Sequence, residues 1–318
     1  MRRTIDFGDW QRSPCGEEHR WFSVLLISDA DFGIRVLKTA ERSEVVHASM
    51  PGSRGQFILF CISSSTPYLA LNSPLLEGPF YNADRGELRF VDIYAEKVFV
   101  LSVSKSPETL REFSTKDNTI GCAPTTALLT AAAAYSRRDV RRQNVGSTED
   151  GMVLRLDPDG KLHRVVENVI TPNGMGWNRA NTVMFWAESR SGNVYAFDYD
   201  ANTGDIRNQR VFFHLDGANN FNVPDGLVID EEDNIWLALW GGSAVLRISL
   251  DGKVTGKIEL PTRFVTCPVF VGTELFITTA AEVESEKYSE SASYAGNIYR
   301  LDVGVKGLPK YKVPMPAC

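Results

Sequence analysis

The sequence predicts an all-β protein, a β-propeller built of four-stranded antiparallel blades. Two observations lead to this prediction. Short apolar strands alternate with polar turns rich in Gly, Pro, Asn and Asp, a pattern typical of antiparallel sheets. Three segments also repeat one order of strands and turns, at residues 75–103, 171–200 and 223–252. Asn173 and Asp225, near the openings of the second and third segments, lie about 50 residues apart, and propeller blades repeat every 40 to 50 residues or so.

The three repeats share their internal order. Each opens with a polar residue beside Pro and Gly, and the opening triplets are EGP (77–79), PNG (172–174) and PDG (224–226). Each then has an apolar stretch and a turn, followed by one of the strands LRFVDI, VMFWAE and IWLALW and a further strand. A weaker fourth copy covers residues 267–304, with the strand-like pieces CPVFV, ELFITT and NIYRLDV.

The region between the first and second repeats is irregular. Residues 119–135 have the pattern of the first two strands of a blade, with a short helix as the alternative because Ala and Leu favour helices. Residues 136–150 are strongly charged and predict a solvated loop, and residues 151–166 have the pattern of the last two strands. These pieces together predict one composite blade.

Residues 1–69 do not show the repeat, although they contain strand-like pieces. The alternatives are an additional blade, a separate cap or a disordered segment, and the residues do not distinguish them. We therefore divide the chain into an N-terminal region, 1–69, and a propeller, 70–318.

Composition excludes several classes of protein. The chain has 34 basic and 40 acidic residues and a net charge of −6, without a long basic block, so a nucleic-acid partner is not expected. Its apolar runs are far shorter than the roughly 20 residues that cross a bilayer, so no membrane partner is expected. Asp6 and Asp9 stand where a signal peptide has its apolar core, which predicts a cytoplasmic protein. The five cysteines form no Cys-x-x-Cys pair.

The opening triplets, together with LRFVDI, LALWGG and ELFITTA, resemble the regucalcin/gluconolactonase family, and its fungal members most closely. The resemblance extends over roughly residues 67–308. It implies a six-bladed propeller with one divalent cation in the central channel, bound by Glu77, Asn173 and Asp225. It also implies hydrolysis of a small-molecule sugar lactone, such as gluconolactone, to the aldonic acid, with Asp225 as proton acceptor and donor. The oligomeric state is left open.

The chemistry of the three residues agrees with this resemblance. The innermost strands of propeller blades begin near one end of the channel, so residues far apart in sequence meet there. Two carboxylates and one amide carbonyl make an oxygen-only set suited to Ca²⁺, Mg²⁺ or Mn²⁺, with Zn²⁺ as a further possibility. A cation there can polarise a lactone carbonyl while Asp225 takes a proton as general base. The alternative is a purely local role, because Asn-Gly and Asp-Gly are common turn formers.

The sequence departs from the family at one block. Family members carry Arg-x-Asn-Asp-Gly between the second and third blades, where it helps to bind the sugar hydroxyls. The nearest match is RQNVG, residues 142–146, with Val145 in place of the Asp. Glu77 and Asn173 also lie only about two blade repeats apart, where six-bladed members need three. One blade's worth of sequence is therefore absent.

Three structural outcomes remain open: a ring of five blades, a ring completed by the N-terminal region, or a fold with unpaired strand edges. Two further functional hypotheses also remain. One is a non-catalytic propeller that binds calcium or another ligand, because an enzyme needs positioning groups as well as a metal. The other is a different catalytic propeller, of the strictosidine synthase-like or paraoxonase-like kind.

Overall fold

The computed structural model describes residues 60–105, 107–114, 151–157, 161–218 and 221–309 of the 318-residue chain. In this part of the chain the strands form five sheets. The helical elements described are a 3₁₀ turn, η1 (Pro107–Thr109), and a short helix, α2 (Ser289–Tyr294). Among the described residues we find no apolar helix of membrane-spanning length.

The sheets follow one another along the chain as antiparallel meanders. The first contains β2 (Leu76–Asn82), β3 (Glu87–Asp92), β4 (Lys97–Ser102) and β5 (Arg111–Ser114), and the second pairs β6 (Gly151–Leu156) with β7 (Leu162–Val169). The third contains β8 (Pro172–Trp177), β9 (Val183–Glu188), β10 (Asn193–Tyr199) and β11 (Ile206–His214). The fourth contains β12 (Val223–Ile229), β13 (Ile235–Trp240), β14 (Ala244–Ile248) and β15 (Val254–Glu259). The fifth contains β16 (Val265–Val271), β17 (Glu274–Thr279) and β18 (Ile298–Asp302).

The predicted strands are confirmed where the structure describes them. β9 and β13 have the same bounds as the segments VMFWAE and IWLALW, and β6 and β7 are the two strands expected near residues 151–166. The segment 119–135 and the charged segment 136–150 lie outside the described residues. The number of blades therefore stays a prediction.

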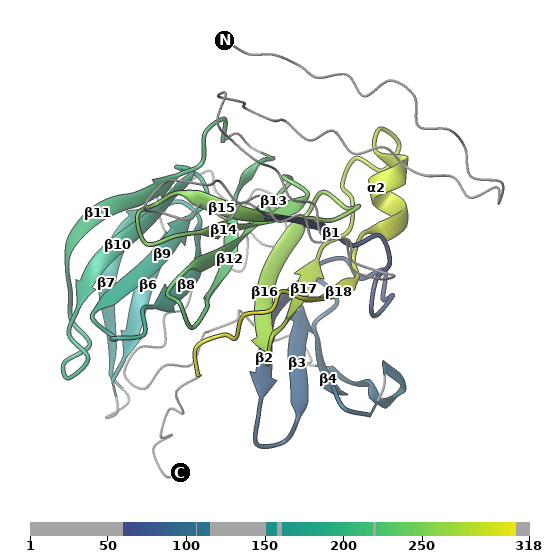
Figure 1. The fold of residues 1–318 in the computed structure, drawn as a ribbon, viewed down its shortest axis with the longest axis horizontal. Helices are drawn as coiled ribbons and strands as arrows, with labels where there is room; N and C mark the ends of the chain where they lie inside the picture. The colour runs from purple at the N-terminus through teal and green to yellow at the C-terminus, as the bar shows by residue number, and fades with distance from the viewer. Residues whose placement is uncertain (1–59, 106, 115–150, 158–160, 219–220, 310–318) are drawn as a thin grey trace, which may run out of the picture.

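The hydrophobic core lies between consecutive sheets. Phe185 on β9 belongs to one apolar cluster with Leu237 on β13. Trp236, on the other face of β13, meets Phe270 on β16 edge to face, with ring centroids 5.9 Å apart. Because the third, fourth and fifth sheets each contribute to two apolar clusters shared with neighbouring sheets, the sheets stack as the blades of a β-propeller, and Figure 1 shows β12 between β8 and β16.

The chain before β2 joins two of these sheets. β1 (Phe60–Ser63) pairs in parallel with β15 and makes the fourth sheet five-stranded. Further on, the buried side chain of Asn297, next to β18, accepts hydrogen bonds from Leu71 N at 2.8 Å and Asn72 N at 3.0 Å. Residues 60–72 thus pack on the fourth and fifth sheets. Residues 1–59 lie outside the described residues, and the division at 69/70 stays a prediction.

The acidic segment 282–291 differs from the solvated insertion that its sequence suggests. Val283 is exposed, but the side chain of Glu282 is buried. Its carboxylate lies 3.1 Å from Arg263 Nη1 and accepts a 2.8 Å hydrogen bond from Ser291 Oγ in α2. Arg263 supplies the opposite charge that lets an acid be buried here, so this side of the segment is docked onto the fifth sheet.

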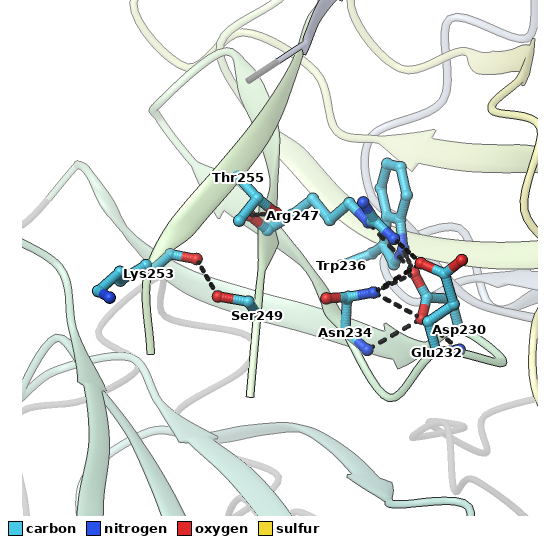
Figure 2. Close-up of polar contacts among 8 residues, drawn as sticks. All are labelled: Asp230, Glu232, Asn234, Trp236, Arg247, Ser249, Lys253 and Thr255. Atoms are coloured by element: carbon cyan, nitrogen blue, oxygen red, sulfur yellow. Dashed lines mark hydrogen bonds and ion pairs between the residues drawn. The ribbon is translucent and has the colours of Figure 1, made fainter. Parts of the chain in front are cut away.

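The turn between β12 and β13 is organised by a buried carboxylate, Asp230 (Figure 2). Asp230 accepts hydrogen bonds from Asn234 N at 2.9 Å and Trp236 Nε1 at 2.9 Å, and Arg247 Nε lies 3.3 Å away. Figure 2 shows these donors converging on it. The charge of this buried acid is therefore matched by hydrogen bonds and by an arginine.

Candidate metal centre

The innermost strands of four sheets, β2, β8, β12 and β16, carry the same irregularity. β12 lies against β8 on one side and β16 on the other, and β16 lies against β2. Each has one residue more than its partner strand at one point, between Glu77 and Phe80, Pro172 and Met175, Pro224 and Leu227, and Val265 and Cys267. These are β-bulges, which commonly re-aim side chains next to active sites. The three candidate ligands lie at these bulges.

The strand register refines the repeat seen in the sequence. Asn173 and Asp225 are both the first unpaired residue of their bulge, so they occupy equivalent positions. In β2 that position is taken by Gly78, and Glu77 lies one residue earlier, paired with Val91. Gly78 has a φ of 51°, in the left-handed region that favours glycine, and its N–H donates to Glu77 Oε2 at 3.2 Å.

Two glycines let the inner strands approach each other closely. A Cβ added to Gly174 would lie 2.5 Å from the carbonyl oxygen of Asp225. One added to Gly226 would lie 2.6 Å from Cys267 Cβ and 2.7 Å from the carbonyl oxygen of Thr266. Such distances are too short for any side chain, so only glycine fits where β8 meets β12 and where β12 meets β16. The glycine of each Asn-Gly or Asp-Gly pair therefore serves packing between blades.

Asp225 is a buried carboxylate, with 3% of its surface exposed. Burial raises its pKa well above the usual range, and the nearby negative charge of Glu77 raises it further. Hydrogen bonds from the Asn173 side chain and from the Gly226 N–H act in the opposite direction. Its Oδ1 atom is buried and has no hydrogen-bond partner among the described residues. This oxygen is available for a cation.

Glu77 is the second acid of the site, and it is partly buried. Burial raises its pKa to about 7, and the hydrogen bond from the Gly78 N–H lowers the pKa by a smaller amount. Among the described residues, neither Glu77 nor Asp225 forms a salt bridge, whereas the buried acids Asp230 and Glu282 face Arg247 and Arg263. The pair therefore lacks the positive partner that Asp230 and Glu282 have.

These observations fit a divalent cation. Two acids whose pKa values are raised by burial, that of Asp225 also by the charge of Glu77, are stabilised by a positive ion between them. The donors are oxygens only, which suits a hard cation. Within the described ranges no group of three or more His, Cys, Asp and Glu has metal-binding geometry. The third group here is the amide of Asn173, so Glu77, Asn173 and Asp225 remain the candidate ligands.

A residue that the sequence did not point to lies beside Asn173. The amide Nδ2 of Asn173 donates a 3.2 Å hydrogen bond to the hydroxyl of Ser189, which is buried. Ser189 follows Glu188, the last residue of β9, which pairs with Pro172 at the start of β8. The place of Ser189 directly after Glu188 was the only feature of the sequence that could have pointed to it. The segment RQNVG, 142–146, lies outside the described residues.

Comparisons with known proteins agree with the fold. The family profile described as SMP-30/Gluconolactonase/LRE-like region matches residues 118–281. The solved structure of the calcium-binding protein regucalcin from Agrobacterium tumefaciens superposes with a TM-score of 0.64 at 18% identity. That match covers 80% of this chain and 99% of the other. At this identity the likeness shows the fold.

Curated relatives are similar at the level of sequence. The pentonolactonase XacC of Haloferax volcanii is 32% identical over 172 residues, 52% of this chain and 58% of that protein. Regucalcin of Gallus gallus is 31% identical over 175 residues, 54% of this chain and 58% of that protein. The chain thus spans little more than half the length of the curated relatives it matches. Because the family profile covers slightly more than half of the 318 residues, the chain belongs to the SMP-30/gluconolactonase/LRE-like family.

Proposed function

We propose that this protein hydrolyses a small-molecule sugar lactone to the aldonic acid, with one divalent cation held by Glu77, Asn173 and Asp225. The observation that carries the proposal is the buried Asp225, whose Oδ1 has no hydrogen-bond partner in the described part of the chain and whose pKa is raised by burial and by Glu77. Membership of a family that includes a pentonolactonase supports the choice of a lactone as substrate.

The proposed reaction adds water to the ester bond of the lactone ring. When bound, a divalent cation supplies Lewis-acid polarisation of the carbonyl group. Asp225 accepts a proton from the attacking water as the bond between water oxygen and carbonyl carbon forms. It returns that proton to the ring oxygen when the ester carbon–oxygen bond breaks, which releases the hydroxyl and the carboxyl group of the product.

The surroundings of Asp225 suit this role. A carboxylate of ordinary pKa is a weak base at neutral pH, and burial beside Glu77 makes Asp225 more basic. One carboxylate oxygen of Asp225 can contact the cation while the other accepts and returns the proton. Asn173 contributes a neutral ligand, so the site neutralises two negative charges with one divalent ion.

The test is lactone hydrolysis by metal-stripped protein, followed through acid release across a panel that includes glucono-1,5-lactone. Ca²⁺, Mg²⁺, Mn²⁺ and Zn²⁺ are added separately. We expect activity with at least one cation in the wild type and a loss of at least about 100-fold in kcat for Asp225→Ala. The control is Asp251→Ala, which removes an exposed acid from the turn after β14 in the same sheet. Equal rates for wild type and Asp225→Ala would contradict the proposal.

A second candidate is a propeller that binds a cation without turnover. The observation that favours it is Val145 in the segment RQNVG, where family members carry an Asp in the block that contacts sugar hydroxyls. Substrate positioning supplies much of the rate of an enzyme, so its loss can silence a site that still binds metal. Calorimetric cation binding without hydrolysis of any lactone in the panel would select this candidate.

A further inference from the structure

The turn after β9 is cross-linked to the start of β8 by one buried carboxylate. Glu188 accepts a 2.8 Å hydrogen bond from Thr171 N, two residues before Asn173. It also accepts a 2.7 Å bond from Ser191 N on the other side of the turn. Ser189 N donates to the carbonyl of Thr171 at 3.1 Å. These bonds fix the backbone of Ser189 relative to the strand that carries Asn173.

The hydroxyl of Ser189 is thereby directed at the Asn173 side chain. Ser189 is 4% exposed, and its Oγ accepts the 3.2 Å hydrogen bond from Asn173 Nδ2. The Asn173 side chain also lies close enough to the carboxylate of Asp225 to lower its pKa. An amide nitrogen has two hydrogens, and its carbonyl oxygen is the only atom of the group that binds a cation. The bond to Ser189 engages the nitrogen end of the amide, so Oδ1 is the end left for a metal.

We propose that Ser189 is a positioning residue for Asn173: its hydroxyl holds the amide in the orientation in which Oδ1 is presented to the divalent cation. This inference rests on the proposed function, because it requires a cation bound at Asn173. Hydrogen-bond partners of metal ligands fix ligand orientation, and their removal weakens metal affinity about 10- to 100-fold. Without the Ser189 hydroxyl, the amide can rotate about its Cβ–Cγ bond and present its nitrogen to the site.

The test measures cation affinity by calorimetry on metal-stripped protein, with Ca²⁺, Mg²⁺, Mn²⁺ and Zn²⁺ as probes. We expect Ser189→Ala to weaken the dissociation constant of the bound cation about 10- to 100-fold. Ser189→Cys is a second variant, because it keeps a similar volume and replaces the hydroxyl by a weak acceptor. Ser189→Thr retains the hydroxyl and is expected to restore most of the affinity.

The matched control is Ser191→Ala in the same turn. The Ser191 hydroxyl donates to the carbonyl of Glu188 at 3.2 Å and so belongs to the turn itself. Its loss is expected to lower the melting temperature of the metal-free protein about as much as Ser189→Ala does, while the cation dissociation constant stays within about twofold of wild type. If the role of Ser189 is purely structural, Ser189→Ala and Ser191→Ala should change the cation dissociation constant by the same factor.

A double-mutant cycle completes the test. If Ser189 acts through Asn173, adding Ser189→Ala to Asn173→Ala causes no further loss of affinity. Wild-type affinity in Ser189→Ala and Ser189→Cys would overturn the inference and leave the proposed function intact. Equal weakening by Ser189→Ala and Ser191→Ala would also overturn it. No cation binding by the wild type would reject the proposed function, and this inference with it.

Discussion

Glu77 lies close enough to Asp225 for its negative charge to raise the pKa of the Asp225 carboxyl group. The two residues come from the innermost strands β2 and β12, and burial raises the pKa of both, that of Glu77 to about 7. Asp230, at the other end of β12, is equally buried but faces Arg247. The negative charge of Asp230 is therefore balanced by Arg247, whereas that of Asp225 is left for a cation to balance.

The raised pKa values predict how the stability of the metal-free protein depends on pH. Ordinary Glu and Asp side chains have pKa values of 4.5 and 3.8, so the folded state keeps the protons of Glu77 and Asp225 to higher pH than the unfolded chain does. Stability from these groups is then present below those values and declines as pH rises towards 7 and beyond. Thermal unfolding in a chelator should show a melting temperature that falls between pH 5 and pH 8.

The control for this prediction is Asp225→Asn, which has nearly the same shape and no charge. It should flatten the decline and raise the melting temperature of the metal-free protein at pH 8 above that of wild type. Added Ca²⁺ or Mn²⁺ should stabilise wild type more at pH 8 than at pH 5, because protons compete with the cation. Parallel pH profiles for wild type and Asp225→Asn would contradict this account.

Gly226→Ala should damage both packing and the site. The new Cβ would lie 2.6 Å from Cys267 Cβ and 2.7 Å from Thr266 O, so β12 has to move away from β16. Overpacking of this kind destabilises by about 1 to 3 kcal/mol, and the shift carries Asp225 with it. We expect a lower unfolding free energy in urea and weaker cation binding. Cys267→Ala, which adds no bulk at the facing position, is the control and should bind the cation as wild type does.

Much of the fold could be predicted from the sequence, because the inner strands are apolar and follow polar turns. The outer strands β5 and β11 were not predicted, since REFS and IRNQRVFFH are largely exposed and show no clear alternation. The pairing of β1 with β15 joins segments about 200 residues apart, and no local pattern encodes a partner at that distance.

The candidate site was predictable in its residues and less so in its geometry. Asn173 and Asp225 share a position, but the one-residue offset of Glu77 depends on the bulge in β2, which only the strand register reveals. Ser189 is a serine in a polar turn, and its place directly after Glu188 does not by itself reveal its contact with Asn173. The burial of Glu282 depends in the same way on Arg263, which comes from another part of the sheet.

Asp230→Ala should destabilise the fold without weakening the cation site. The change removes a carboxylate that accepts from Trp236 Nε1 and that faces Arg247, whose other acid partner, Glu232, stays in place. Breaking a buried ion pair by removing one partner costs about 3 to 5 kcal/mol. We expect a correspondingly lower unfolding free energy in urea. The folded variant should retain the wild-type cation dissociation constant, because Asp230 and Asp225 lie at opposite ends of β12; a large change in that constant would contradict this separation.

Asn297→Ala should loosen the attachment of the segment before β2. Leu71 N and Asn72 N both donate to Asn297 Oδ1, and a hydrogen bond of this kind contributes about 0.5 to 1.5 kcal/mol to stability. Hydrogen exchange at these two amides should accelerate. Asn297→Asp keeps an acceptor oxygen and should protect them better than Asn297→Ala. Equal exchange rates in wild type and Asn297→Ala would show that the segment is held elsewhere.

The most direct test of the central claim is calorimetric titration of the metal-stripped protein with Ca²⁺, Mg²⁺, Mn²⁺ and Zn²⁺, on wild type and on Asp225→Asn side by side. The account predicts one cation bound per chain in the wild type. It also predicts that affinity falls by at least about 100-fold in Asp225→Asn, although that variant is folded and more stable than wild type at pH 8. Unchanged cation binding in Asp225→Asn, or none in the wild type, would contradict it.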